Sequence, residues 1–311
     1  MKIFYLIKKR ILNFGKLFYA FKYAIKVKMR IRRGAKIYLH PVIFFKVILR
    51  LFSAPFFKID SVCLPGEEGF ESKLNRIIRG MISSEKIDGK SYFDFKEFKI
   101  FVPKFKNAEN ILVNDFREVY LENIYGKHFF MGRAIRDNDV VLDLGANIGG
   151  FSLWACTQGK NIKCYAVEPH PLILDELDAN VILNGLENQI FRIGKCISSN
   201  NERLRMSFNV DVFTMTRISA TEESTEVDSI TVDSLVNSLN LIKLDLIKFD
   251  IEGAERIAIA GATQTLKKFK PKLALSGYHL VDDVYFLIDQ LLEIQPNYTI
   301  VVGSNMHIYA F

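Results

Sequence analysis

The sequence predicts an α/β protein with a doubly wound, mostly parallel sheet and a basic helical extension at its N-terminus. From about residue 128 onward, apolar strands alternate with helical stretches, which is typical of such a sheet. Three of these strands end in acidic residues, at the edge where α/β sheets bind ligands. Hydrophobic residues make up 49% and charged residues 25% of the chain, which excludes collagen-like and wholly disordered proteins.

Charge is distributed unevenly along the chain. Residues 1–59 contain 15 of the 42 Lys and Arg residues and none of the 35 Asp and Glu residues, so the remainder carries a net charge of −8. An acidic body with a basic arm argues against a nucleic-acid coat protein, and we expect no nucleic-acid partner. The four cysteines lack C-x-x-C spacing and are too few for a disulfide scaffold, which fits a reducing compartment such as the cytoplasm.

The first 33 residues are predicted to form an amphipathic helix that Gly34 ends. Its apolar stripe consists of Phe4, Ile7, Ile11, Phe14, Phe18, Phe21 and Ile25. Bases on the other faces would let residues 1–34 lie on an anionic membrane surface, peripheral to its inner face. Packing of the stripe on the body or on a second copy is the alternative. No uncharged run approaches the length of a membrane span, and no secretory signal is recognisable.

Three regions are expected. Residues 1–60 form the basic amphipathic helical extension, in which 35–60 could be a second interfacial helix broken at Pro55. Residues 61–125 form an accessory α+β region, where weak alternation from Ser91 to Val102 predicts a half-buried strand or two. Residues 126–311 form the main domain.

The main domain is predicted to contain seven strands. They are Val140–Leu144, Cys164–Val167, Ile190–Ile193, Leu246–Ile251, Leu273–Leu275, Thr299–Val302 and His307–Phe311. Helices are expected near 149–158, 171–184, 254–268 and 281–293. Only four residues separate the last two strands, so these should form an antiparallel hairpin at the end of the chain.

A glycine-rich turn follows the first of these strands. The strand ends at Asp143, and Gly145, Asn147, Gly149 and Gly150 follow before a helix. A GxGxxG turn would predict a dinucleotide, but Asn147 replaces the middle glycine. The preceding acid disfavours a phosphate and favours a ligand with an ammonium or sulfonium group. An ordinary strand-to-helix turn is the alternative.

The second strand ends at Glu168, whose carboxylate could accept two hydrogen bonds from ribose hydroxyls. A solvated strand-end carboxylate is the alternative. Asn180 and Asn184 lie on the following helix and at its end, where Asn184-Gly185 indicates a helix C-cap first and a ligand contact second.

A third acidic segment follows a strand that should lie beside the first one in the sheet. Asp250 ends this strand, and Glu252, Gly253 and Glu255 open the next helix. Asp250 and Glu252 would lie at the ligand-binding edge. For Glu255, stabilisation of the helix dipole is the simpler interpretation.

Together, these segments resemble the FkbM family of S-adenosylmethionine-dependent methyltransferases over about residues 116–311. The family motifs appear in order as DLGANIG (143–149), EP (168–169), NVILNG (180–185), T-x-D-x-L (231–235) and IKFDIEGAE (247–255). Tyr278-His279 and the closing IYAF also look like the family's end. The joint match is specific, whereas each motif alone is not.

The resemblance implies a Rossmann-like class I methyltransferase sheet of seven strands and S-adenosyl-L-methionine as cofactor. Gly145, Asn147 and Gly149 would cradle its methionine part, with Asp143 near the ammonium. Glu168 would hold the ribose, Cys196 would border the adenine, and Asp250 would also contact the cofactor.

The family's substrates vary, so the resemblance implies the cofactor better than the acceptor. Together with the basic arm, which could hold the enzyme near a membrane-borne acceptor, it favours O-methylation of a glycan or lipid-linked saccharide. A neutral hydroxyl is a poor nucleophile, so a base must take its proton, and the candidates are Asp250, His279 and Glu252. A small-molecule natural product, a non-catalytic cofactor-fold module and a nicotinamide dehydrogenase are the alternatives. Asp250, Glu252 and Glu255 could offer oxygen ligands to a metal, but their spacing does not demand one, and we expect none.

Overall fold

The computed structural model describes residues 37–39, 82–103, 112–113, 117, 119, 124–125, 134–208, 216–218, 224–280, 282–303 and 305–311. The amphipathic helix predicted over residues 1–33 lies outside the described residues, and so does the second interfacial helix apart from residues 37–39. The division of the chain at residues 60 and 125 therefore stays a prediction.

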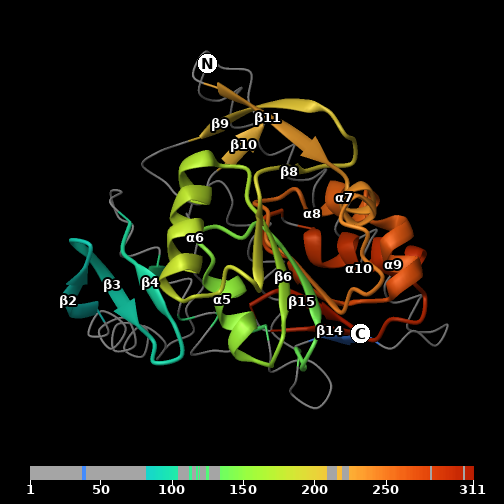
Figure 1. Ribbon diagram of the computed structural model, residues 1–311. Helices are drawn as coiled ribbons and strands as arrows, with labels where there is room; N and C mark the ends of the chain where they lie inside the picture. Colours follow the sequence, from blue (N-terminus) through green and yellow to red (C-terminus); the bar gives the residue numbers. More distant parts are fainter. Residues whose placement is uncertain are drawn as a thin grey trace, which may run out of the picture.

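The central sheet confirms the doubly wound α/β prediction (Figure 1). Its strand order is β1-β14-β15-β13-β12-β5-β6-β7. All neighbours run parallel except β15, which is antiparallel to both β13 and β14, as expected for a terminal hairpin. The strands are β1 (Ile37–Leu39), β5 (Val140–Leu144), β6 (Lys163–Val167), β7 (Ile190–Ile193), β12 (Leu246–Phe249), β13 (Lys272–Ser276), β14 (Ile300–Val302) and β15 (His307–Ala310).

The sheet has eight strands rather than the seven predicted, because β1 adds a strand from the N-terminal region. Residues 37–39, expected to continue as helix, pair in parallel with β14. Ile37 packs against the core, whereas Tyr38 on the opposite face is 60% exposed. The added strand satisfies the backbone groups of β14, which would otherwise be an open edge.

Helices cover both faces of the sheet, and the alternation of side chains along each strand explains why. Leu142 and Leu144 pack with α7, α8, α9 and α10 on one face, whereas Val141 packs with α5 and α6 on the other. The helices are α5 (Gly150–Thr157), α6 (Pro171–Leu183), α7 (Val232–Ser238), α8 (Glu255–Ala260), α9 (Thr263–Phe269) and α10 (Asp283–Ile294). The fold therefore has three layers.

One predicted helix is divided in two. The stretch expected near 254–268 forms α8 and α9, separated at Gly261 and Ala262. An added Cβ on Gly261 would lie 2.7 Å from the carbonyl oxygen of Ser198, so this glycine permits close packing against a neighbouring loop. The short helix α7 was not predicted; Thr231 begins it by accepting a hydrogen bond from the Ser234 amide.

An accessory sheet of three strands docks on α6. It consists of β2 (Ile82–Ile87), β3 (Lys90–Asp94) and β4 (Lys99–Phe101), so the predicted strands between 91 and 102 are present. The side chain of Asn184 accepts from the Lys99 amide and donates to the Lys99 carbonyl. Asn180 accepts from the Phe101 amide and donates to the Ile148 carbonyl in the glycine turn. Both asparagines therefore join the accessory sheet to the main domain.

A second small sheet, which the sequence did not reveal, has the order β10-β9-β11-β8. Its strands are β8 (Cys196–Ile197), β9 (Arg203–Phe208), β10 (Thr216–Ile218) and β11 (Ser224–Ile230). Charged residues pair across these strands, among them Arg203 with Glu226 and Asp228. β9 pairs antiparallel with both β10 and β11, whereas β8 and β11 run parallel.

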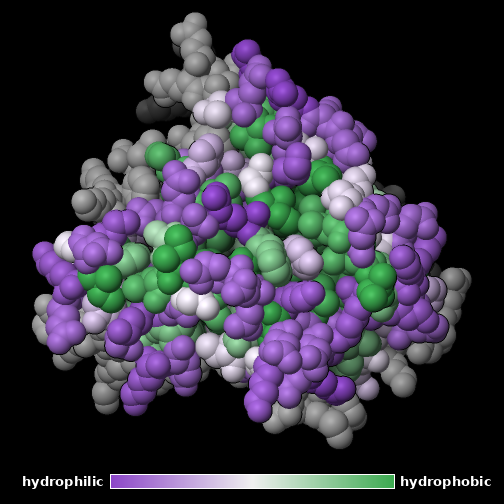
Figure 2. Space-filling view, viewed as in Figure 1, coloured by the Kyte–Doolittle hydropathy of each residue, from purple (hydrophilic) through white to green (hydrophobic). Residues whose placement is uncertain are grey.

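Hydrophilic residues dominate the surface seen in Figure 2, with hydrophobic residues gathered between α6 and α7. Within the described part of the chain, none of the helices has the length and apolar character needed to cross a membrane.

Candidate active site

Three predicted segments meet at the carboxyl edge of the central sheet. Leu144, the last residue of β5, is opposite Val167 of β6 on one side and Phe249 of β12 on the other. This register places the glycine turn between Glu168 and Asp250, which follow those strands. The sheet therefore unites segments that are more than 100 residues apart.

The glycine turn depends on backbone conformations that most residues avoid. Gly145 has φ +79°, and an added Cβ would collide with the main-chain carbonyl oxygen of Asp250. Asn147 has φ +50°, and its side-chain oxygen accepts a hydrogen bond from the Ile148 amide. Asparagine tolerates this left-handed region better than other non-glycine residues, which explains how it can replace a glycine here. Gly149, with φ +95°, precedes the first turn of α5.

Asp143 is fully buried beneath this turn and both of its carboxylate oxygens have protein partners. Oδ1 lies 2.9 Å from the ammonium of Lys248, and Oδ2 accepts from the Ser152 hydroxyl. Lys248 also donates to the Gly145 carbonyl at 2.9 Å, so the pair anchors the turn. Contact of Asp143 with the ammonium of a cofactor stays a prediction.

Lys248 is a functional candidate that sequence reasoning missed. It is only 4% exposed, in a strand whose other three residues are apolar and fully buried. A charged residue inside such a strand is the signal that could have found it, because buried lysines require a partner.

Glu168 is buried beside the turn, and its two oxygens accept hydrogen bonds from the Asn147 and His170 amides. Burial raises the pKa of Glu168 to about 7, against the opposing effect of these amides. Cys196 lies in β8, and burial, reinforced by the charge of Glu168, raises the pKa of its thiol to about 11. The thiol is therefore neutral near pH 7. The ribose role of Glu168 and the adenine role of Cys196 stay predictions.

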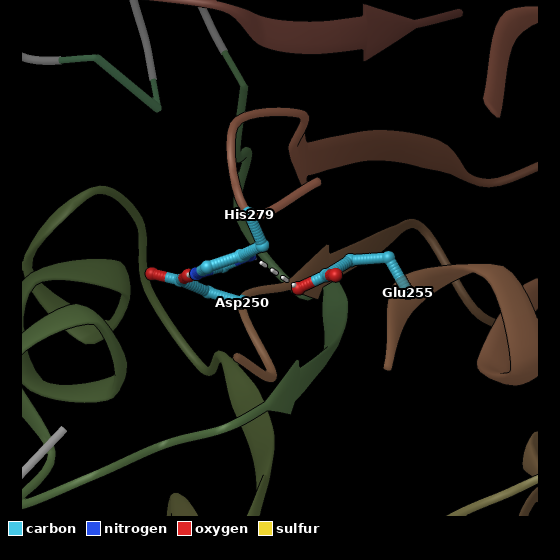
Figure 3. A group of neighbouring side chains, drawn as sticks. All are labelled: Asp250, Glu255 and His279. Atoms are coloured by element: carbon cyan, nitrogen blue, oxygen red, sulfur yellow. Dashed lines mark ion pairs between the residues drawn. The ribbon is translucent and has the colours of Figure 1, made fainter. Parts of the chain in front are cut away.

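A cluster of three carboxylates surrounds one imidazole, and we call Asp250, Glu252, Glu255 and His279 the acid–imidazole cluster. Nδ1 of His279 lies 3.1 Å from Glu255 Oε1, while Nε2 lies 3.6 Å from Glu252 Oε2 and 3.9 Å from Asp250 Oδ1. Glu252 and Gly253 both have positive φ values, which turn the chain sharply between β12 and α8. Figure 3 shows the ring of His279 between Asp250 and Glu255.

Opposing electrostatic effects act on the cluster. Burial lowers the pKa of His279, but the ion pair with Glu255 and the charges of Asp250 and Glu252 outweigh it and raise the pKa to about 9. Burial likewise raises the pKa of Asp250, but nearby Lys248, His279 and His307 prevail and lower it. At neutral pH, His279 is therefore protonated and Asp250 ionised.

Two tyrosines complete this side of the site. The hydroxyls of Tyr125 and Tyr278 each donate to Asp250 at 3.4 Å. Tyr125 comes from the accessory region and packs edge-on against Phe151 of α5, with ring centroids 4.9 Å apart. Sequence reasoning missed Tyr125, since nothing in its local sequence relates it to a carboxylate 125 residues away.

Ligand atoms of Asp250, Glu255 and His279 lie within 4.8 Å of one another, a spacing that could admit a cation. In the present arrangement, however, the two carboxylates face opposite nitrogens of the ring. The prediction of no metal remains untested.

The sheet order, the reversed last strand β15 and the glycine turn after β5 define a class I methyltransferase fold. Residues 143–300, just over half of the chain, match the family profile described as the methyltransferase FkbM domain. The chain belongs to this family of S-adenosylmethionine-dependent methyltransferases.

Two characterised relatives share limited segments with the chain. The 31-O-demethyl-FK506 methyltransferase FkbM of Streptomyces tacrolimicus is 32% identical over 102 residues, covering 32% of this chain and 37% of that protein. The AMB antimetabolite synthetase AmbE of Pseudomonas aeruginosa is 32% identical over 79 residues, covering 25% of this chain and 4% of that protein. The chain thus matches well under half of either relative.

The chain is also similar to proteins of known structure. The methyltransferase FkbM of Methylobacillus flagellatus aligns with a TM-score of 0.47 and 17% identity, covering 88% of this chain and 73% of that one. Fibrillarin of Aeropyrum pernix, solved with bound S-adenosyl-L-methionine, aligns with a TM-score of 0.40 and 13% identity. The alignment covers 74% of this chain and 86% of fibrillarin.

Proposed function

We propose that the protein transfers a methyl group from S-adenosylmethionine to a hydroxyl of a glycan or lipid-linked saccharide. The observation that carries the proposal is the position of the acid–imidazole cluster, directly beside the glycine turn at the ligand-binding edge. Proton-accepting groups are what a neutral hydroxyl requires. The name of the Streptomyces relative describes an O-methyltransferase, which supports an oxygen acceptor.

The residues of this edge fit the cofactor. Carboxylates of Glu168, Asp250 and Glu252 form an acidic rim, which suits a ligand carrying an ammonium, a sulfonium and a ribose diol. The turn at Gly145, Asn147 and Gly149 would hold the methionine part and Glu168 the ribose, with Cys196 near the adenine. When bound, the cofactor supplies an electrophilic methyl group on a positively charged sulfur.

The protein's own contribution is to align the acceptor, exclude water and accept a proton. Alignment alone accounts for up to about 7–11 kcal/mol in the best cases. The hydroxyl proton of the acceptor would move to an Asp250 oxygen, or to His279 Nε2 once the imidazole has lost its own proton. Glu252, the most exposed of the three candidate bases, would bind the acceptor or serve as an alternative base.

The two favoured bases, His279 and Asp250, predict different pH dependences of the methyl-transfer rate. If His279 is the base, it must first lose its own proton, and the rate should rise with pH toward a midpoint near its pKa of about 9. If Asp250 is the base, its lowered pKa keeps it ionised, and the rate should not rise over this range.

A natural-product hydroxyl is the second candidate acceptor, since the Streptomyces relative is named for a natural-product substrate. The glycan acceptor is favoured by the basic arm, residues 1–34, which would hold the enzyme at the anionic inner face of a membrane near a lipid-linked substrate. Equal sedimentation with anionic vesicles by the full chain and by a chain lacking residues 1–34 would exclude this membrane role.

Calorimetry with S-adenosylmethionine and with NAD tests the cofactor assignment. Binding of NAD alone would overturn the proposal. Transfer of a labelled methyl group into cell extract, separated into lipid, glycan and small-molecule pools, tests the acceptor. Label in the glycan or lipid pool supports the leading proposal, and label in the small-molecule pool supports the natural-product alternative. If none of the three pools is labelled, both acceptor proposals are refuted.

A further inference from the structure

We propose that Glu255 is a positioning residue that orients the imidazole of His279, directing Nε2 toward the methyl acceptor. The role rests on the proposed function, because it assumes that an acceptor binds beside the acid–imidazole cluster. It differs from the helix-dipole role that the sequence indicates for Glu255.

The burial of Glu255 does not match a simple helix-dipole role. Carboxylates at helix N-termini stabilise the dipole while remaining solvated, so this role needs no burial. Glu255 is instead 0% exposed, and burying a carboxylate is unfavourable unless it is paired. Its Oε1 accepts from the Ile251 amide at 2.9 Å, which precedes α8, and lies 3.1 Å from His279 Nδ1. The carboxylate is thus held between the strand-end turn and the imidazole.

The solvent exposure of the side chains in the acid–imidazole cluster shows which side of the His279 ring is buried and which is accessible. The Glu255 side chain is 1% exposed and lies behind the ring, whose own exposure is 13%. On the Nε2 side, Asp250 is 26% and Glu252 is 37% exposed. These exposures place Nδ1 on the buried side of the ring and Nε2 on the more accessible side. In Figure 3, the dashed line joins the ring to Glu255, and Asp250 lies on the other side of the ring. A buried carboxylate on one imidazole nitrogen fixes which nitrogen exchanges protons with a substrate.

A second ion-pair network holds Glu255 and His279 at this separation. Arg256, next to Glu255 on α8, pairs with Asp282 and Asp283 at the start of α10. Asp283 in turn accepts from the amide of Leu280, the residue after His279. The two members of the orienting pair are thus connected through their sequence neighbours.

Within the described part of the chain, several charged groups face His279 and bear on its titration. Glu255 faces it from α8, Asp250 from the end of β12 and Glu252 from the intervening turn, and the ring of Tyr278 packs against it at 4.5 Å. Lys248 and His307 act on it indirectly, through Asp250. Of these groups, Glu255 makes the shortest ion pair with His279, so its removal should shift the titration most.

The test compares Glu255→Gln with Glu187→Gln, an exposed control, in the full-length chain. Histidine resonances are followed by NMR across pH, and the His279 signal is assigned with His279→Asn. We expect the pKa of His279 to fall in Glu255→Gln and to stay unchanged in the control. Above about pH 9, where His279 of the unmodified protein is neutral, the rate of methyl transfer should fall by up to about 100-fold, the lower end of the contribution of general base catalysis, with little change in cofactor affinity.

An unchanged His279 titration in Glu255→Gln would overturn the proposal. Because Glu255→Gln leaves the imidazolium of His279 without its nearest counter-charge, which can prevent folding, Glu255→Asp is the second variant. It should keep the raised pKa with a partial loss of rate. A rate that requires added Mg²⁺ or Mn²⁺ after EDTA treatment would instead assign the cluster to a cation and overturn the proposal. The two proposals can fail separately. If the unmodified protein transfers no methyl group but Glu255→Gln still lowers the pKa of His279, the proposed function is refuted, whereas the pairing of Glu255 with His279 is supported.

Discussion

Replacing Lys248 by Met would remove the ammonium that lies beneath the glycine turn while keeping a side chain of similar length. Asp143, which is 0% exposed, would then retain only the Ser152 hydroxyl as a partner, and the Gly145 carbonyl would lose its donor. Removing one partner of a buried ion pair typically costs about 3–5 kcal/mol, because the other charge is left uncompensated. We expect Lys248→Met to lower the free energy of unfolding by about this amount.

Urea denaturation of the full-length protein measures the effect, and Lys243→Met provides a matched control. Lys243 also pairs with two carboxylates, of Asp139 and Asp245, but its side chain is 46% exposed. Solvent screening should limit the loss in the control to about 1 kcal/mol or less.

A double-mutant cycle with Asp143→Asn separates the pair from the packing of its side chains. The double variant removes both charges and should be more stable than the sum of the single losses predicts. Cofactor affinity should fall in Lys248→Met, since the turn loses an anchor. Equal losses in Lys248→Met and Lys243→Met would refute the reasoning that burial makes this pair important.

Three further predictions concern the turn and its supports. Gly145→Ala should abolish cofactor binding, measured by calorimetry, because the added methyl collides with the Asp250 carbonyl; wild-type affinity would show that the turn is not the binding element. Because the pKa of Glu168 is raised to about 7 in the folded state, the native protein binds more protons than the unfolded chain between about pH 4.5 and 7, so its stability should fall as pH rises through that window. Glu168→Gln should remove this part of the slope in urea unfolding and weaken cofactor binding, and an unaltered slope would contradict the raised pKa. Asn180→Ala should cost about 1–3 kcal/mol for each partner left unsatisfied and expose the accessory sheet to limited proteolysis, whereas unchanged cleavage would show that other contacts hold that sheet.

Much of the fold could be predicted because its signals are local. The strands Val140–Leu144 and Ile190–Ile193 were predicted with their observed boundaries, since short apolar runs bounded by turns define them. The strands β9 to β11 escaped prediction. Polar and apolar residues alternate along β9, a signal that the sequence analysis did not use, whereas β10 and β11 form strands through their pairing with β9. The strand β1 was missed for a related reason, as its three residues form a strand through pairing with β14.

The candidate site likewise has features that could be predicted from the sequence and features that could not. Glycines and strand-end acids can be recognised in the sequence alone, and from them the sequence by itself determined the α/β class and the family. It predicted the edge of the sheet at which the cofactor would bind. Only the tertiary structure decided which charged groups pair, Lys248 with Asp143 and Glu255 with His279, and that the hydroxyl of Tyr125 donates to Asp250. The physical reason is that Coulomb and hydrogen-bond energies depend on distances of a few ångströms, and strand register and helix docking set those distances between residues far apart in the chain.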